Sequence, residues 1–140
     1  MGDLTTNFGS KEFACPCCGR VKVDGVLVAS LQRMRDFMGE SIYITSGFRC
    51  SVYNRLCGGV KRSQHVSGKA ADIWAADMDG LFLAAKVEFI NGGIGIYPDA
   101  NFIHVDTRGT KARWGRVNGE YVSYQAALGP WMELIKGALC

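Results

Sequence analysis

The sequence predicts an α+β domain in which helices pack on a small antiparallel sheet. Short runs rich in β-branched and aromatic residues, such as residues 42–45, are typical of strands. They alternate with longer segments in which apolar residues recur at helical spacing, as in residues 24–39. With 140 residues, of which 48% are hydrophobic and 21% charged, the chain fits one domain, residues 1–140, and shows no bias toward disorder.

Two helices are expected in the first two thirds of the chain. The first begins at Asp24 or Gly25 and ends at Gly39. Its apolar positions follow a helical period, and they are Val26, Leu27, Leu31, Met34 and Phe37. The second helix is capped by Asp77 and runs to about residue 91, where two consecutive glycines stop it. The core faces of both helices should cover the sheet.

Four strands are expected, at residues 42–45, 70–75, 94–97 and 102–106. The last two should form a hairpin, because the segment between them contains the turn residues Pro98 and Asp99. Residues 1–24 are expected to form an extended lead-in with a Cys-rich turn, and residues 50–62 a loop with one helical turn. Residues 107–125 are a Gly- and Arg-rich loop with a weak strand near 121–124. The C-terminal segment, residues 126–140, contains a short amphipathic helix at 130–139. In the lead-in, Phe8 and Phe13 are expected to anchor the chain to the core.

The charge pattern argues against several kinds of partner. The net charge of +3 is mild and no basic run occurs, so we expect no nucleic-acid binding. The N-terminus lacks a positively charged start followed by an apolar segment, and no apolar run approaches the roughly 20 residues of a membrane-spanning helix. We therefore expect a monomer without a signal peptide or membrane insertion. It would be made in the cytoplasm and released by another protein or by lysis.

The only two histidines lie beside strand-like runs that also carry aspartates. His65 precedes Asp72 by seven residues, and His104 precedes Asp106 by two. Residues two apart in a strand point the same way, so His104 and Asp106 should share a face. If Asp72 lies on a neighbouring strand, then His65, Asp72 and His104 can supply three ligands to one zinc ion. A fourth position is left for water, as a catalytic zinc requires.

Each of these residues also has an ordinary structural interpretation. A single histidine in an apolar strand, such as His104, is more often a hydrogen-bonded core residue than a metal ligand. Asp72 suits a strand-end cap, Asp99 suits its Pro-containing turn, and Arg49 suits an exposed surface position. If metal is bound, a carboxylate must take the proton of water, and Asp106 and Asp99 are the nearest in the sequence.

Six cysteines form a second pattern, and they are Cys15, Cys17, Cys18, Cys50, Cys57 and Cys140. The first three crowd one turn before Gly19, in a Cys-x-x-Cys-Gly arrangement typical of half a zinc knuckle. Cys50 and Cys57 flank a later loop and could complete a four-sulfur site. The alternatives to a metal site are disulfides and reduced thiols. The terminal Cys140 is expected to be a free thiol.

The motif Ser63-x-His65-x-x-Gly68-x-Ala70-x-Asp72 lies between Ser46-Gly47-Phe48-Arg49 and His104-Val105-Asp106. Together these motifs resemble the D-alanyl-D-alanine carboxypeptidase family of zinc peptidases. That family shares its fold with the hedgehog signalling domain and includes bacteriophage endolysins that cut peptidoglycan peptides. The small phage-type branch is the most similar, through Cys-Pro-Cys-Cys-Gly near the start and Gly-Ile-Gly-Ile-Tyr-Pro before the second histidine. The resemblance covers residues 12–115.

This resemblance implies roles for the residues of the motifs. It implies zinc binding by His65, Asp72 and His104. It also implies that Arg49 polarises the scissile carbonyl and stabilises the oxyanion. The substrate groove would be lined by Ser63, Gln64 and Trp114.

One position departs from the family pattern. Many members carry an acidic residue three positions before the last histidine, where this chain has Asn101. Because asparagine cannot act as a base, we expect Asp106 to take the proton, with Asp99 in reserve. The cysteine turn occurs in the phage-type branch and is expected to be a scaffold element.

The resemblance therefore predicts hydrolysis of amide bonds in the stem peptides or cross-links of peptidoglycan. The most economical setting is a phage or prophage endolysin that a holin releases to the cell wall. A different class of function is a zinc-stabilised wall-binding module without catalysis, which the missing acid at position 101 makes possible. A third interpretation, a cysteine-zinc protein that binds nucleic acid, lacks the basic stripe that such binding needs.

Overall fold

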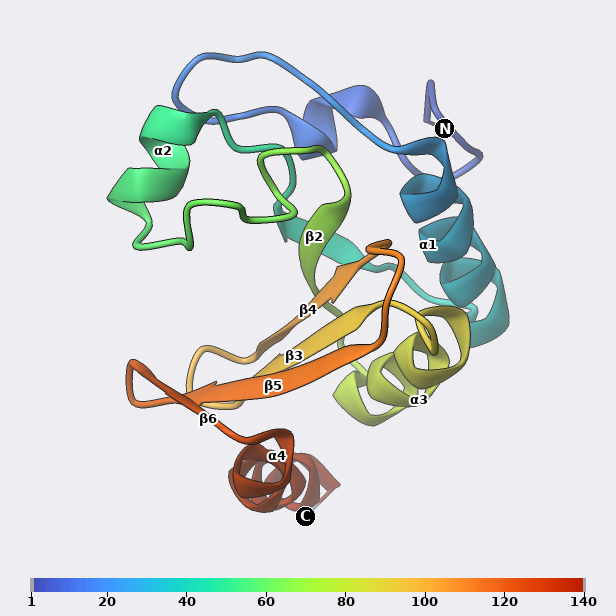
Figure 1. Ribbon diagram of the computed structural model, residues 1–140. Helices are drawn as coiled ribbons and strands as arrows, with labels where there is room; N and C mark the ends of the chain where they lie inside the picture. The colour runs from blue at the N-terminus through green and yellow to red at the C-terminus, as the bar shows by residue number, and fades with distance from the viewer. Residues whose placement is uncertain (1, 140) are drawn as a thin grey trace.

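The computed structural model describes residues 2–139, with side chains through residue 132, around a six-stranded sheet. The strands lie in the order β1-β2-β4-β3-β5-β6 (Figure 1). Their bounds are Tyr43–Ser46 (β1), Ala70–Trp74 (β2), Gly93–Tyr97 (β3), Phe102–Asp106 (β4), Ala112–Val117 (β5) and Glu120–Val122 (β6). The helices are Gly25–Met38 (α1), Ser51–Leu56 (α2), Met78–Glu88 (α3) and Tyr124–Leu139 (α4), and Ser10–Phe13 forms a short 3₁₀ helix, η1.

The predicted α+β class is confirmed, and so are the two central helices and the four central strands. Helix α1 ends where Gly39 adopts a left-handed φ of 69°, a conformation that glycine adopts at little cost. The side chain of Asp77 caps α3 by accepting the N–H of Gly80 at 2.9 Å. β3 and β4 form the predicted hairpin, in which Tyr97 pairs with Phe102.

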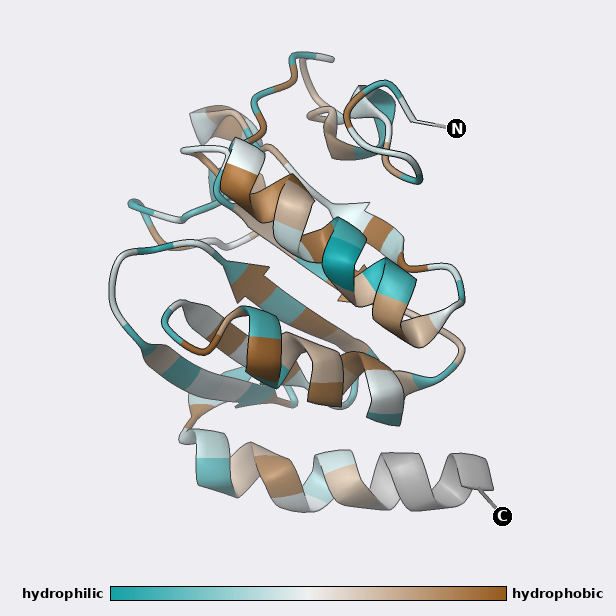
Figure 2. Cartoon of the chain, turned by 90° about the vertical axis from the view of Figure 1, so that its right-hand side faces the viewer, coloured by the Kyte–Doolittle hydropathy of each residue, from teal (hydrophilic) through white to brown (hydrophobic). Residues whose placement is uncertain are grey.

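The hydrophobic core lies between the sheet and the helices. Figure 2 shows α1 and α3 side by side in front of the sheet, with α4 beneath them. The sheet contributes fully buried residues at alternate positions, among them Ile73, Ile94, Ile96, Ile103 and Val105. Burial of each such side chain stabilises the fold by roughly 1.5–3 kcal/mol. No helix within residues 2–139 is long and apolar enough to cross a membrane.

The prediction of a loop over residues 107–125 is wrong for residues 112–117, which form β5, whereas the weak strand predicted near 121–124 corresponds to β6. β5 and β6 form a hairpin there, and β5 pairs in parallel with β3, so the sheet is mainly but not wholly antiparallel. The sequence of β5 lacks alternation, and tertiary contacts determine its conformation instead. Trp114 fits against the bare backbone of Gly95, where a Cβ would lie 2.6 Å from its ring. Pairing with β3 therefore makes this segment a strand.

Two helices are longer than predicted. Residues 51–56 form a complete helix, α2, rather than a single turn. Helix α4 begins at Tyr124 instead of residue 130, because the hydroxyl of Ser123 caps it by accepting the N–H of Ala126 at 3.1 Å. Pro130 consequently lies inside the helix. Cys140 lies outside the described residues.

The lead-in is tied to the loop between β1 and α2. Phe8 and Phe13 are each 1% exposed, which confirms them as anchors. The N–H of Phe48 donates to the carbonyl of Phe13 at 2.9 Å. Gly47 permits this close approach, since a Cβ there would lie 2.6 Å from the Cα of Phe13. The N-terminal segment thus supports the loop that carries Arg49.

Candidate metal centre

One row of residues crosses the face of the sheet opposite to the core. In the strand register, each of these residues pairs with the next: Ser46, Asp72, His104, Gly95 and Trp114. Directly paired residues project to the same face of a sheet. The register therefore places Asp72 next to His104, although 31 residues separate them in the sequence.

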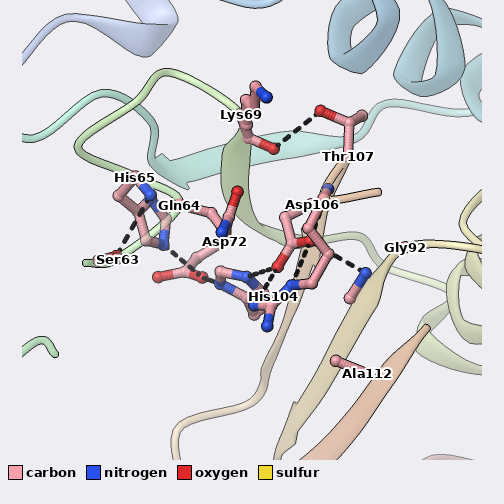
Figure 3. Close-up of polar contacts among 12 residues, drawn as sticks. Ser63, Gln64, His65, Lys69, Asp72, Gly92, His104, Asp106, Thr107 and Ala112 are labelled. Carbon is pink, nitrogen blue, oxygen red and sulfur yellow. Dashed lines mark hydrogen bonds and ion pairs between the residues drawn. The ribbon is translucent and has the colours of Figure 1, made fainter. Parts of the chain in front are cut away.

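Three potential ligand atoms converge at this row (Figure 3). Nε2 of His65 lies 3.2 Å from Oδ1 of Asp72, and Nδ1 of His104 lies 3.1 Å from the same oxygen. The three ligand atoms lie within 4.8 Å of one another, and all three residues are buried. One divalent cation at their centre would contact all of them.

The remaining nitrogen of each imidazole is held by an acceptor. Nδ1 of His65 lies 2.8 Å from the carbonyl oxygen of Gly47, and Nε2 of His104 lies 2.8 Å from Oδ2 of Asp106. If these outer nitrogens carry the protons, the inner nitrogens present lone pairs toward Asp72. Acceptors behind histidine ligands are usual in metal sites and fix both tautomer and ring orientation. The donor set therefore fits zinc, which binds imidazole and carboxylate ligands.

The loop before β2 delivers His65 to the row. The backbone N–H of Arg49 donates to the carbonyl of His65 at 3.2 Å. The hydroxyl of Ser63 accepts the N–H of His65 at 3.2 Å. Gly68 turns the chain with a φ of 75°, and a Cβ there would lie 2.6 Å from the carbonyl oxygen of Lys22. Glycine is required at this turn for both reasons.

The charges around Asp72 favour its ionised form. Burial alone would raise the pKa of Asp72, but His65 and His104 hold it well below its usual range. Burial alone would lower the pKa of His104, but its bonds to Asp106 and Asp72 raise it. Nη2 of Arg49 lies 3.0 Å from Oδ2 of Asp72. Oδ1 is therefore the oxygen that faces both imidazoles.

Asp106 lies behind His104, away from the centre of the cluster. It is fully buried, and its oxygens accept bonds from His104, from the N–H of Gly93 and from Arg108. A base must reach the water that it deprotonates. This placement does not suit the predicted role of Asp106 as proton acceptor, and it suits the orientation of His104.

The cluster forms part of a cavity of about 430 Å³. Its lining includes the predicted residues Arg49, Ser63, Gln64 and Trp114. Arg49 also donates from Nε to the hydroxyl of Ser46 at 2.9 Å. The ring of Trp114 lies 5.0 Å from that of His104, centroid to centroid.

The structure separates Asp99 from this cavity. Asp99 is exposed on the β3–β4 turn, where its carboxylate accepts the N–H of Asn118 at 3.2 Å. It is absent from the described residues that line the cavity, and this placement does not suit the predicted role of reserve base. The cavity is also lined by Tyr97, Arg108 and Arg116, which were not predicted from the sequence. Alternation along the strands could have found Tyr97, because it lies two residues after Gly95.

Comparisons with known proteins agree with this geometry. The sequence profile of Peptidase M15 matches residues 6–106. A probable peptidoglycan L,D-endopeptidase MepK from Haemophilus influenzae is 38% identical over 84 residues, which are 56% of this chain and 45% of that protein. The peptidoglycan L,D-endopeptidase MepK of Escherichia coli K12 is 31% identical over 103 residues, which are 66% of this chain and 54% of that protein.

The chain therefore spans about half the length of the curated relatives that it matches. The profile match covers both histidines and Asp72, together with the strands that position them. On the strength of that match, which extends over more than half of its residues, the chain belongs to the Peptidase M15 family.

Proposed function

We propose that this protein is a zinc-dependent peptidase that hydrolyses amide bonds in the stem peptides or cross-links of peptidoglycan. The observation that carries the proposal is the convergence of His65, Asp72 and His104 at the wall of an open cavity. Membership of Peptidase M15 and the similarity to proteins named as peptidoglycan L,D-endopeptidases support the same substrate.

The three residues of the cluster would hold the metal. Zinc bound there would act as a Lewis acid and lower the pKa of bound water toward neutrality. Asp106 would keep the proton of His104 on Nε2, so that Nδ1 stays available. The carbonyl of Gly47 would do the same for His65.

Arg49 is placed to bind the carbonyl oxygen of the substrate. A guanidinium has five N–H donors, and Arg49 uses two of them on Ser46 and Asp72 and a third, at 3.5 Å, on Asn54. Two donors remain for an oxygen in the cavity. The bond from Arg49 to Asp72 fixes the guanidinium group beside the ligand cluster. Donors fixed in this way stabilise the charge that develops in a transition state.

The charge of the cavity favours an anionic substrate. Its lining includes four arginines, which are Arg49, Arg62, Arg108 and Arg116, against a single carboxylate, that of Asp72. The stem peptides of peptidoglycan carry several free carboxylates. Arg62 and Arg116 make no ion pair among the described residues, so they are available for these groups.

A second function is favoured by the same lining. Apart from Asp72, no described residue of the cavity wall offers a carboxylate to take a proton from water. A zinc-stabilised module that binds the wall without cleaving it would need no such group. The substrate itself could supply a carboxylate to a catalytic site, so the two functions require a direct test.

We further propose an endolysin role, in a phage or prophage, because the cysteine turn and the motifs around His104 resemble the small phage-type branch. In that setting the enzyme would reach the wall after release from the host cytoplasm. Monomeric action on the wall, without nucleic acid or membrane insertion, is part of the same proposal.

Digestion of purified peptidoglycan tests the enzymatic function. We expect the protein to release soluble muropeptides, and mass spectrometry of their new termini identifies the bond that is cut. His65→Ala and Asp72→Asn should abolish release, whereas Asp79→Asn, an exposed aspartate on α3, should not. Chelation should abolish release and zinc should restore it. Binding to peptidoglycan without release would favour the wall-binding module, and neither binding nor release would refute both functions.

A further inference from the structure

A second group of potential metal ligands lies away from the catalytic cluster. The sulfurs of Cys15, Cys18 and Cys50 lie within 4.8 Å of one another. Cys15 and Cys50 are buried, and Cys18 is exposed. Cys57, which could have completed a four-sulfur site by sequence, follows the other end of α2 and instead lines the catalytic cavity.

The turn that holds the first two sulfurs is built for ligation. The N–H of Gly19 donates to the carbonyl of Cys15 at 2.8 Å, and the N–H of Cys15 donates to the carbonyl of Arg20 at 2.8 Å. Gly19 closes the turn with a φ of 73°, a conformation that residues other than glycine rarely adopt. This backbone turn brings Cys15 and Cys18 onto one side of the loop.

Polar groups already point at these sulfurs. The N–H of Cys50 donates to Sγ of Cys15 at 3.5 Å, and the N–H of Tyr53 donates to Sγ of Cys50 at 3.4 Å. The neighbouring Cys18 raises the pKa of the Arg20 guanidinium. Three thiolates on one divalent ion leave one negative charge, and these donors and the guanidinium would stabilise it.

We propose that Cys15, Cys18 and Cys50 bind a structural zinc ion as thiolates. In a tetrahedral site with Zn–S bonds of about 2.3 Å, the sulfurs lie about 3.8 Å apart, which is compatible with the observed cluster. A disulfide could join only two of the three and would leave the third thiol beside it.

This zinc would fasten the lead-in to the loop that serves the catalytic cluster. Cys50 directly follows Arg49, and Cys15 lies two residues after Phe13, whose carbonyl holds Phe48. Gly47, in the same loop, supplies the acceptor for His65. Loss of the sulfur site should therefore loosen Arg49 and His65 without removing any ligand of the catalytic cluster.

Metal content of the full chain, purified under reducing conditions, tests this proposal. We expect two zinc ions per chain in the wild type and one in Cys18→Ser, a substitution at an exposed position. Cys57→Ser is the matched control and should keep both ions. A variant with both His65→Ala and His104→Ala should keep one ion, held by sulfur alone.

Cobalt substitution gives a second measurement, which can be read on the wild type alone. Cobalt in the wild type should produce the near-ultraviolet charge-transfer bands of thiolate ligands, and Cys18→Ser should weaken them. Wild-type protein with one zinc ion and no thiolate bands would overturn the proposal. So would a disulfide between any two of Cys15, Cys18 and Cys50, found by mass spectrometry of the protein as isolated from cells.

Discussion

Replacement of Asp106 by asparagine separates two roles that its carboxylate could have. The two oxygens of Asp106 accept bonds from His104 Nε2 at 2.8 Å, from Gly93 at 3.0 Å and from three N–H groups of Arg108 at 2.7–3.1 Å. Although burial alone would raise the pKa of Asp106, these bonds from His104 and Arg108 hold it below its usual range. The residue is thus an ionised acceptor, and its interactions are nearly saturated.

The amide of Asp106→Asn would preserve only part of this arrangement. Its oxygen can still accept from Gly93 and Arg108, but its NH₂ group would face the N–H of His104 and one N–H of Arg108. His104 would then have to rotate, or move its proton to Nδ1, the atom that faces Asp72. Loss of such a supporting carboxylate lowers metal affinity or activity by about 10- to 100-fold. That corresponds to about 1.4–2.8 kcal/mol of binding free energy.

Zinc affinity, measured by competition with a chromophoric chelator, is the assay. We expect a 10- to 100-fold weaker affinity in Asp106→Asn, with a folded circular dichroism spectrum. Arg108→Gln controls for the lost ion pair, because it leaves in place the bond that His104 donates to Asp106. Wild-type zinc affinity combined with an activity loss of several orders of magnitude would refute this reasoning and restore Asp106 as the proton acceptor.

Four other outcomes are expected. Arg49→Lys should lower kcat by on the order of 100-fold while zinc content stays at the wild-type level, because an ammonium cannot reproduce the fork of donors; steady-state kinetics with metal analysis checks this. Asp99→Asn should leave peptidoglycan release within about twofold of the wild type, because Asp99 lies outside the cavity. Gly95→Ala should destabilise the protein by about 1–3 kcal/mol in urea unfolding, because its Cβ would lie 2.6 Å from the Trp114 ring. Metal-free protein should lose thermal stability as pH rises from about 6 through the raised pKa of His104. The reason is that folding favours protonated His104, whose pKa in the unfolded chain is about 6.5. Zinc-loaded protein, in which His104 is already neutral, should show no such loss.

The sequence predicted the elements whose local pattern and tertiary role agree. Helix α1 has apolar residues at helical spacing and a glycine at its end, and the strands of the β3–β4 hairpin flank a Pro-Asp turn. Strand β5 was not predicted, because its residues, including Trp114, follow no strand period. Its stability comes from parallel pairing with β3. The sequence does not predict the start of α4, because its cap, Ser123, lies in a segment whose composition is typical of a loop.

The candidate site was predictable in its members but not in its chemistry. Residue types and spacing singled out His65, Asp72 and His104, which the sheet register and one glycine turn then bring together. The role of Asp106 could not be read from sequence, because the same position two residues after His104 suits a base or a supporting acceptor equally well. Only the fold shows that Asp106 faces Gly93 and Arg108 behind the imidazole.

The same sheet explains why a small chain can hold a polar cluster without losing its core. Alternation along β2 and β4 sends Ile73 and Ile103 into the core and Asp72 and His104 to the opposite face. A shift of β2 by one residue against β4 would turn Asp72 toward the helices, at a cost of several kcal/mol. The apolar face thus fixes the register, and the register fixes the distance between the two ligands. Metal binding geometry in this protein is therefore a consequence of core packing, and core substitutions such as Ile103→Ala should weaken zinc affinity as well as stability.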